Sequence, residues 1–258
     1  RSSQYLVKHV QYSQEWSAQD IVLRTVLFRL FSWIPTWDSI GGETVSCETF
    51  DYQNLNRLLG VRFNGGEKLY TSAFILSGST TFGQSRKHSN HLKLVEKMVF
   101  DDDIASKIGA SRSMLEVYDL LIAYPMIGKF MAYQLAVDLN YSAVTDFDES
   151  SFTMAGPGAE RGIRKCFKSI GDRSLEEIIL YMVSSQGEHF HRLGLDFRGL
   201  YGRKLQAIDC QGLFCETDKY SRVKFPELIS NRARIKTAYS ASGDLEPLFF
   251  PPKWGIVV

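Results

Sequence analysis

Carboxylate side chains occur at two places where this sequence could carry out acid–base chemistry. Asp146 and Asp148 lie in a polar loop, and Asp209 and Glu216 lie in an apolar stretch with helical spacing. A carboxylate can remove a proton from a nucleophile or balance the positive charge that develops on a sugar. These four residues are therefore candidate catalytic residues. Solvated capping acids, or a structural ion-pair network, are the alternative interpretation.

A second group of residues could contact phosphate. Gly128 can adopt a positive φ angle or let another backbone come close, and the N–H groups at the start of the following helix suit a phosphate oxygen. Gly156 and Gly158 flank a proline and have the same potential, and Arg161 adds positive charge nearby. The candidate nucleic-acid contacts are Tyr124, Met126, Ile127, Gly128, Lys129, Gly156, Gly158, Arg161, Lys219 and Arg222.

Local helix signals surround the turn at residues 124–128. Ser113 with Glu116 forms the pattern of a capping box, and Pro125 disfavours a helical conformation at Tyr124. Apolar residues recur at helical spacing on both sides of the turn: Leu115, Tyr118, Leu121 and Ile122 before it, and Met131, Leu135, Ala136 and Leu139 after it. The sequence therefore predicts a hairpin of two helices over residues 113–140, with its turn pointing outward.

Capping signals elsewhere predict further helices. Ser17 begins a strongly apolar helix that Pro35 ends, the acids at 101–103 include an N-cap, and Ser174 begins a helix that runs to Val183. Other helices are expected over residues 50–59, 89–100, 159–167 and 203–222, whereas residues 68–76 fit either a strand or a short helix. The basic residues at 86–88 could contact phosphate, with a solvated loop as the alternative.

The hairpin and the acidic loop together resemble the helix-hairpin-helix superfamily of DNA glycosylases. The resemblance rests on the pattern Tyr-Pro-x-Ile-Gly-Lys, the helix that follows it, and an aspartate twenty residues after Gly128. It implies that the hairpin binds the DNA backbone and that Asp148, rather than Asp146, faces an extruded nucleotide. Superfamily members that also cut the strand use a lysine two residues after the glycine, where this chain has Phe130. Lyase activity at this position is therefore not expected, and Lys129 is interpreted as a phosphate contact.

A second resemblance extends over nearly the whole chain. Its motifs are residues 3–6 (SQYL), 27–31 (LFRLF), 34–37 (IPTW), 156–159 (GPGA), 205–216 (LQAIDCQGLFCE), 219–222 (KYSR) and 250–255 (FPPKWG). These segments resemble the family of α-glutamyl/putrescinyl thymine pyrophosphorylases, whose helical module is also known as the helical domain of 5-hydroxymethyluracil DNA kinases. The resemblance implies an offshoot of the glycosylase fold that acts on hypermodified thymine in DNA.

The two resemblances imply a protein that acts on, or reads, a flipped modified pyrimidine in double-stranded DNA. In the family the implied reaction is the displacement of pyrophosphate from an activated 5-hydroxymethyluracil by an amine. A monofunctional DNA glycosylase that excises a modified base with the help of an aspartate is one alternative. A non-catalytic DNA-binding module that partners a kinase is another. No cofactor is expected for any of them.

Length and composition are compatible with these functions. The chain has 258 residues, of which 44% are hydrophobic, and its net charge is +1 from 30 basic and 29 acidic residues. This is ample for a buried core, and a near-neutral total neither supports nor excludes DNA binding, which depends on local charge. We predict a mainly α-helical, two-lobed fold like that of a helix-hairpin-helix DNA glycosylase, with little or no sheet. One lobe is expected to comprise residues 1–40 and 168–258, and the other residues 41–167.

Three absences restrict the function classes further. No Gly-x4-Gly-Lys-Ser/Thr sequence is present, so this chain is not expected to phosphorylate by a P-loop mechanism, and any kinase would be another domain or protein. The four cysteines and the His-x-His pair at 189–191 lack paired ligand spacing, so no metal site is predicted. Without a signal peptide or an apolar run of membrane length, we expect an intracellular protein, nuclear in a eukaryote and cytoplasmic or nucleoid-associated in a bacterium or virus.

Overall fold

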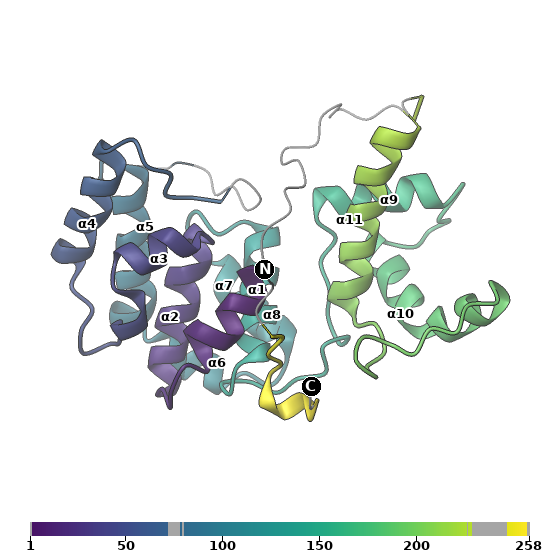
Figure 1. The fold of residues 1–258 in the computed structure, drawn as a ribbon, viewed down its shortest axis with the longest axis horizontal. Helices are drawn as coiled ribbons and strands as arrows, with labels where there is room; N and C mark the ends of the chain where they lie inside the picture. The colour runs from purple at the N-terminus through teal and green to yellow at the C-terminus, as the bar shows by residue number, and fades with distance from the viewer. Residues whose placement is uncertain (1, 72–77, 79, 226, 229–246, 257–258) are drawn as a thin grey trace. The chain divides into compact units, whose positions relative to one another are not determined.

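The computed structural model describes residues 2–71, 78, 80–225, 227–228 and 247–256 of the chain. Over these residues the fold is mainly helical, as predicted, and no β-sheet is present (Figure 1). An isolated antiparallel bridge joins Leu200 and Arg203. None of the described helices is long and apolar enough to span a bilayer. The specific likeness to a glycosylase fold stays a prediction.

The chain forms two compact units. Unit 1 comprises residues 1–147 and 239–258, and unit 2 comprises residues 148–238. Unit 1 contains α1 (Ser2–Tyr5), the π-helix η1 (Leu6–Gln11), α2 (Ala18–Phe31), α3 (Ile34–Ser39), the short helix η2 (Gly42–Thr44), α4 (Tyr52–Asn64), α5 (Lys87–Glu96), the π-helix η3 (Lys97–Asp101), α6 (Ile104–Gly109), α7 (Met114–Ile122), α8 (Lys129–Tyr141) and η4 (Pro252–Trp254). Unit 2 contains α9 (Pro157–Cys166), α10 (Leu175–Arg192) and α11 (Ala207–Lys224). These bounds differ from those of the two expected lobes, whose division stays a prediction.

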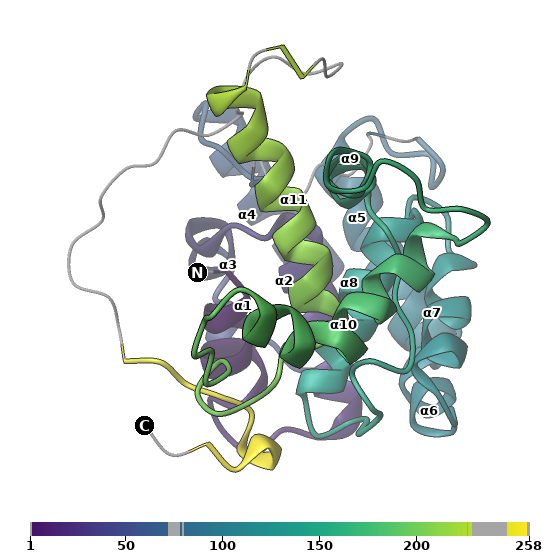
Figure 2. The same ribbon diagram turned by 90° about the vertical axis from the view of Figure 1, so that its right-hand side faces the viewer.

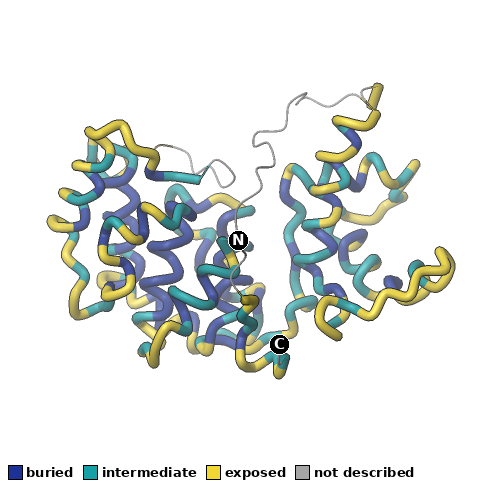
Figure 3. Tube along the Cα trace, viewed as in Figure 1, coloured by how far each residue is buried: buried dark blue, intermediate teal, exposed yellow. Residues whose placement is uncertain are grey.

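Helix α2 is the central element of unit 1. Every residue from Ile21 to Phe31 is buried, and the helix contacts η1, α5, α6 and α8 (Figure 3). A helix that is buried on all sides is typical of a core position. The Ser17 hydroxyl caps it as predicted, accepting a hydrogen bond from the Asp20 N–H at 3.1 Å.

The predicted end of this helix at Pro35 is wrong. The helix ends at Phe31, because Ser32 adopts the left-handed conformation with φ 47°. Pro35 instead lies in the first turn of α3. Proline fits there, since the first helical N–H groups have no partner within the helix.

Two buried guanidinium groups on α2 connect segments that are distant in sequence. Arg24, 0% exposed, donates to the carbonyl oxygens of Val10 at 2.7 Å, Gly42 at 2.9 Å and Val45 at 2.7 Å. Burial lowers the pKa of Arg24 to about 10. Arg29 forms a two-pronged ion pair with the Asp138 carboxylate on α8, at 2.5 and 2.7 Å. These contacts fix η1, the η2 segment and α8 against the core helix.

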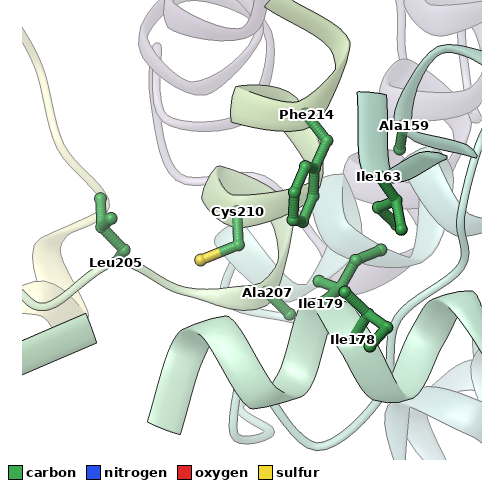
Figure 4. Close-up of a cluster of buried hydrophobic side chains, with 8 residues drawn as sticks. All are labelled: Ala159, Ile163, Ile178, Ile179, Leu205, Ala207, Cys210 and Phe214. Atoms are coloured by element: carbon green, nitrogen blue, oxygen red, sulfur yellow. The ribbon is translucent and has the colours of Figure 1, made fainter. Parts of the chain in front are cut away.

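Helices α9 and α11 pack closely in unit 2 and lie beside each other in both ribbon views (Figure 1, Figure 2). A Cβ atom on Gly162 would lie 2.0 Å from the Phe214 carbonyl oxygen, so a side chain at this position would collide with the backbone of α11. The core around this contact contains Ala159, Ile163, Ile178, Ile179, Leu205, Ala207, Cys210 and Phe214 (Figure 4). Glycine at 162 therefore sets how closely the two helices approach.

Several other helix predictions are confirmed with shifted ends. Asp51 caps α4 and Asp103 caps α6, and Ser174 forms a capping box with Glu177. Helix α10 continues to Arg192, beyond the predicted end. Of the segment predicted as strand or short helix, residues 68–71 form neither, and residues 72–76 lie outside the described residues.

Candidate nucleic-acid interface

The predicted hairpin is present as two helices joined by a short turn. Helix α7 begins at the Ser113 cap, whose hydroxyl accepts from the Glu116 N–H at 3.1 Å. The Glu116 carboxylate accepts from the Arg112 N–H at 2.8 Å, so it reaches one residue further back than in the expected capping box. Helix α7 packs against α8, which starts directly after Gly128.

The conformation of the turn differs from the expectation in one respect. Gly128 has φ −85° and ψ 169°, an extended conformation open to any residue, and Met126 takes the left-handed conformation with φ 65°. A Cβ atom on Gly128 would meet nothing within 4 Å. Glycine at 128 is therefore not required by the turn itself, and it leaves the space in front of α8 open.

The N-terminus of α8 is exposed and has no side-chain cap. Gly128 and Lys129 are exposed, whereas Ile127 is 4% exposed and belongs to the core of unit 1. An uncapped helix N-terminus carries partial positive charge and N–H donors, and it attracts anions. Of the five contacts predicted at the turn, a phosphate could thus reach the exposed Gly128 and Lys129, whereas Tyr124 and Met126 are half-buried and Ile127 is buried.

A pocket lies directly beside this turn. It has a volume of about 640 Å³ and is bounded by η3, α6 and α7, with Tyr124 and Pro125 of the turn in its wall. Tyr124 shares this wall with Asp102, whose carboxylate accepts a hydrogen bond from the Lys97 ammonium at 3.1 Å. Burial, reinforced by the Asp102 carboxylate, raises the pKa of Tyr124, and the Lys97 hydrogen bond lowers the pKa of Asp102. Sequence reasoning assigned no role to Lys97 and interpreted Asp102 only as one of the capping acids, because the fold alone places both in the same wall as Tyr124.

The acidic loop lies at the boundary between the two units. Asp146, 85% exposed, belongs to unit 1 and lies 3.5 Å from the Lys253 ammonium. Asp148 begins unit 2, is exposed, and accepts from the Ser150 N–H at 2.9 Å. The hairpin belongs to unit 1, so a cleft shared by the hairpin and Asp148 stays a prediction.

Within unit 2, the structure brings the acidic loop to the start of α11. The Ser150 hydroxyl donates to the Gln206 side chain at 2.9 Å, and Arg203 is paired with Glu149 at 2.6 Å. Asp209 accepts from the Gln206 N–H at 2.8 Å and is half-buried, and burial raises its pKa. A carboxyl that holds its proton more strongly than usual is suited to proton transfer. The loop that carries Asp148 and the Asp209 carboxyl thus meet at one end of one helix.

The other candidates on α11 lie further along the helix. Glu216 is exposed and forms a 2.5 Å ion pair with Lys219, so the structural interpretation accounts for both side chains. Surface pairs of this kind contribute little to stability. The structure therefore does not bring Glu216 to the end of α11 that carries Asp209.

Arg161 and Arg222 are brought together by a residue that sequence reasoning missed. Asp218, 1% exposed, lies 3.0 Å from Arg161 Nε, 2.8 Å from Lys165 Nζ and 3.4 Å from an Arg222 terminal nitrogen. The signal was present in the sequence, because Arg161 with Lys165 and Asp218 with Arg222 are each spaced by four residues. One buried carboxylate thus orders three cations between α9 and α11.

Comparison with known proteins decides the family. The model of the family described as "5-hmdU DNA kinase, helical domain" matches residues 1–230 of the chain. The chain belongs to this family. A curated relative, the 5-hmdU DNA kinase of Bacillus phage SP10, is 26% identical over 220 residues, which cover 79% of this chain and 34% of the relative. The chain therefore spans about a third of the length of that relative. No solved structure matches.

In this member of the helical-domain family, packing accounts for the glycine within α9. Gly156 is buried as the N-cap of α9, and a Cβ atom on Gly158 would lie 2.9 Å from the Cys215 sulfur. The close approach expected for a ligand at Gly158 is thus occupied by the protein's own α11. A DNA contact by these glycines stays a prediction. No group of His, Cys, Asp or Glu suited to a metal ion occurs among the described residues.

Proposed function

We propose that this helical domain binds double-stranded DNA and positions a 5-hydroxymethyluracil-type base for enzymatic modification. The observation that supports the proposal is the N-terminus of α8. It has no side-chain cap, and a Cβ atom on Gly128 would meet no other atom within 4 Å, so the space in front of the helix is open. Membership of a family named for a DNA kinase supports DNA as the ligand. A phosphate of the DNA backbone accepts hydrogen bonds from the first N–H groups of α8, and the Lys129 ammonium adds a charge contact.

Filling the space in front of α8 is expected to weaken DNA binding. Valine at Gly128 fits the extended backbone but places two methyl groups where the phosphate would lie, so Gly128→Val should bind about 10-fold more weakly, equal to roughly 1.4 kcal/mol. Lys129→Gln should lower the slope of log affinity against log salt concentration by about 1. Fluorescence anisotropy with a duplex that contains one 5-hydroxymethyluracil measures both.

The matched control is Gly187→Val. Gly187 is an exposed glycine in α10 whose Cβ position also meets nothing within 4 Å, so this variant adds the same side chain without obstructing the hairpin. It should bind DNA like the parent protein. Unchanged affinity in Gly128→Val together with an unchanged salt slope in Lys129→Gln would exclude the hairpin as the DNA contact.

The chemistry that we propose is displacement of pyrophosphate from an activated 5-hydroxymethyluracil by an amine. The amine nitrogen bonds to the exocyclic methylene carbon as the carbon–oxygen bond to pyrophosphate breaks, and a carboxylate accepts the proton that the amine loses. The pairing of Ser150 with Gln206 supports Asp148 and Asp209 as the groups concerned, because it holds the Asp148 loop against the helix end that carries Asp209. Asp148 is the base in this proposal, and Asp209 is the second proton-transfer group.

Replacing Asp148 by asparagine is expected to reduce turnover by at least about 100-fold, because a general base contributes about that much or more. DNA affinity should be unchanged, since the carboxylate makes no contact with phosphate in this proposal. The assay incubates the protein with duplexes containing thymine, uracil, 5-hydroxymethyluracil or its phosphorylated forms, and analyses the products by mass spectrometry. Asp146→Asn is the control, because it removes the neighbouring exposed carboxylate of unit 1.

The same assay distinguishes the two other functions. Release of a free base, with no amine adduct, would identify a monofunctional DNA glycosylase. DNA binding without turnover in the parent protein would identify a non-catalytic module that presents DNA to a kinase. The match to about a third of a relative named as a kinase favours this last alternative, since this chain has no P-loop sequence. In that case phosphoryl transfer belongs to another domain or protein.

A further inference from the structure

The pocket beside the hairpin turn has the volume and the mixed lining of a binding site for a small molecule. Its volume of about 640 Å³ is in the usual range for ligand sites, which is about 300–1,000 Å³. Ile104, Leu120 and Ala123 supply apolar wall, and Lys97, Asp102 and Tyr124 supply polar groups. A second hollow in unit 1, of about 590 Å³, is lined by the acids Glu15, Asp20, Glu43 and Glu48, which would repel DNA.

The charges of the pocket favour a neutral ligand over a phosphate. Lys97 is paired with Asp102 at 3.1 Å, and Glu116 is paired with Arg112 at 3.0 Å. The two other charged side chains in the wall, Lys107 and Asp119, are of opposite sign. A phosphate site normally has a surplus of donors with positive charge. This pocket has donors and acceptors in balance, as a nucleobase requires.

We propose that this pocket receives a pyrimidine base turned out of the DNA, and that Lys97, Asp102 and Tyr124 read the imide edge of thymine-type bases. The inference rests on the proposed DNA contact at the hairpin. Tyr124 and Pro125 lie in the pocket wall and Gly128 follows three residues later, so a strand held at α8 passes the pocket. The hairpin and the pocket both belong to unit 1.

The three polar groups in the pocket wall select the class of base. The Lys97 ammonium, a donor, is paired with the Asp102 carboxylate, an acceptor, at 3.1 Å, and the Tyr124 hydroxyl in the same wall is a second donor. Burial raises the pKa of Tyr124, so its hydroxyl keeps a proton to donate at neutral pH. Thymine, uracil and 5-hydroxymethyluracil present carbonyl, N–H and carbonyl along the imide edge, which complements donor, acceptor and donor. Cytosine-type bases present an amino group and a bare ring nitrogen, which leaves two polar groups mismatched.

In this orientation, the part of the base that the pocket recognises is separate from the part that reacts. The 5-substituent of a pyrimidine lies away from the imide nitrogen, so a base held by its imide edge directs its hydroxymethyl group toward the mouth of the pocket. That group is then accessible to a catalytic carboxylate or to a kinase. The pocket thereby reads the base class without participating in bond making.

The test compares affinities for duplexes that differ in one base, 5-hydroxymethyluracil or 5-hydroxymethylcytosine, each placed opposite an abasic site so that extrusion is equally easy. The parent protein should prefer the uracil form by about 10-fold, equal to roughly 1.4 kcal/mol. Tyr124→Phe and Asp102→Asn should lose this preference while keeping the salt slope. Ala110→Phe, an exposed position in the pocket wall, should abolish it by filling the space. Tyr220→Phe, at an exposed tyrosine of α11, is the matched control.

The outcomes separate this inference from the proposed function. If Gly128→Val weakens binding to both duplexes but Tyr124→Phe, Asp102→Asn and Ala110→Phe keep the preference, the pocket is not the base site and the hairpin contact stands. A parent protein that binds both duplexes equally also overturns the inference. If the parent binds no duplex, the proposed function and the inference fail together.

Discussion

Replacing Asp138 by alanine is expected to lower the unfolding free energy of unit 1 by about 3–5 kcal/mol. The Arg29 guanidinium is 0% exposed and is held by both Asp138 oxygens, at 2.5 and 2.7 Å. Removal of the carboxylate would leave a buried positive charge without its counter-ion, which costs far more than the loss of a surface pair. Urea unfolding followed by circular dichroism measures the change.

The double variant Arg29→Met with Asp138→Leu is the control for this prediction. Apolar side chains of similar size fill the space without leaving a charge, so the double variant should recover at least half of the lost stability. The pair joins α2 to α8, the helix whose N-terminus is the proposed phosphate site. A loss below about 1 kcal/mol in Asp138→Ala would contradict the role assigned to the pair.

Acidification is expected to destabilise unit 1 through His91. Its imidazole is 0% exposed, and burial, with added repulsion from Lys87 and His88, lowers its pKa to about 3. The Tyr70 hydroxyl lies 3.0 Å from its Nδ1 atom, and the Phe31 ring packs edge-on at 6.2 Å. The imidazole of a histidine in the unfolded chain has a pKa of about 6.5. Below that pH the unfolded chain therefore binds a proton at this position that the folded chain does not.

The sign and size of the effect follow from this difference. Above about pH 6.5 the proton balance at His91 does not lower the unfolding free energy. Below that pH the unfolding free energy falls by about 1.4 kcal/mol for each pH unit, which gives a loss of roughly 2.7 kcal/mol at pH 4.5. Urea midpoints between pH 7 and pH 4.5 measure it. Carboxylates lose stabilising interactions in the same direction, so the informative quantity is the difference from His91→Gln. That variant should have the shallower pH dependence, and equal slopes would refute the assignment.

Most helix starts were predictable because they depend on local chemistry. Ser17, Asp51, Asp103 and Ser174 each accept a hydrogen bond from an N–H two or three residues later, as their positions ahead of apolar runs indicate. Such interactions need only a few neighbouring residues. A single sequence therefore contains the information that places them.

The end of α10 depended on the fold and was not predictable. Ser184, Ser185 and Gly187 weaken a helix locally, yet α10 continues to Arg192. The Ser184 and Ser185 hydroxyls donate to the Tyr181 carbonyl, at 2.9 and 2.6 Å. Gln186 exchanges hydrogen bonds with the backbone of Leu205, at 3.0 and 2.8 Å. A contact with a residue nineteen positions later thus overrides the local preference.

The candidate site was predictable only where neighbouring residues form it. The turn and the start of α8 were found through proline and glycine spacing, although the left-handed residue is Met126 rather than Gly128. Asp102 and Tyr124 lie in connecting segments between different helices yet line the same pocket, and no local pattern indicates that they are neighbours. Asp101 to Asp103 were interpreted only as a cap, which is correct for Asp103.

The contacts of Arg24 have a practical consequence for any attempt to define the smallest part of unit 1 that folds alone. A shortened chain that started at α2 would retain the guanidinium but lack the Val10 carbonyl that accepts its Nε–H at 2.7 Å. A lysine could not replace it, because an ammonium group lacks the planar fork that reaches Val10, Gly42 and Val45 together. A chain shortened from the N-terminal side should therefore retain η1, even though α2 has its own cap.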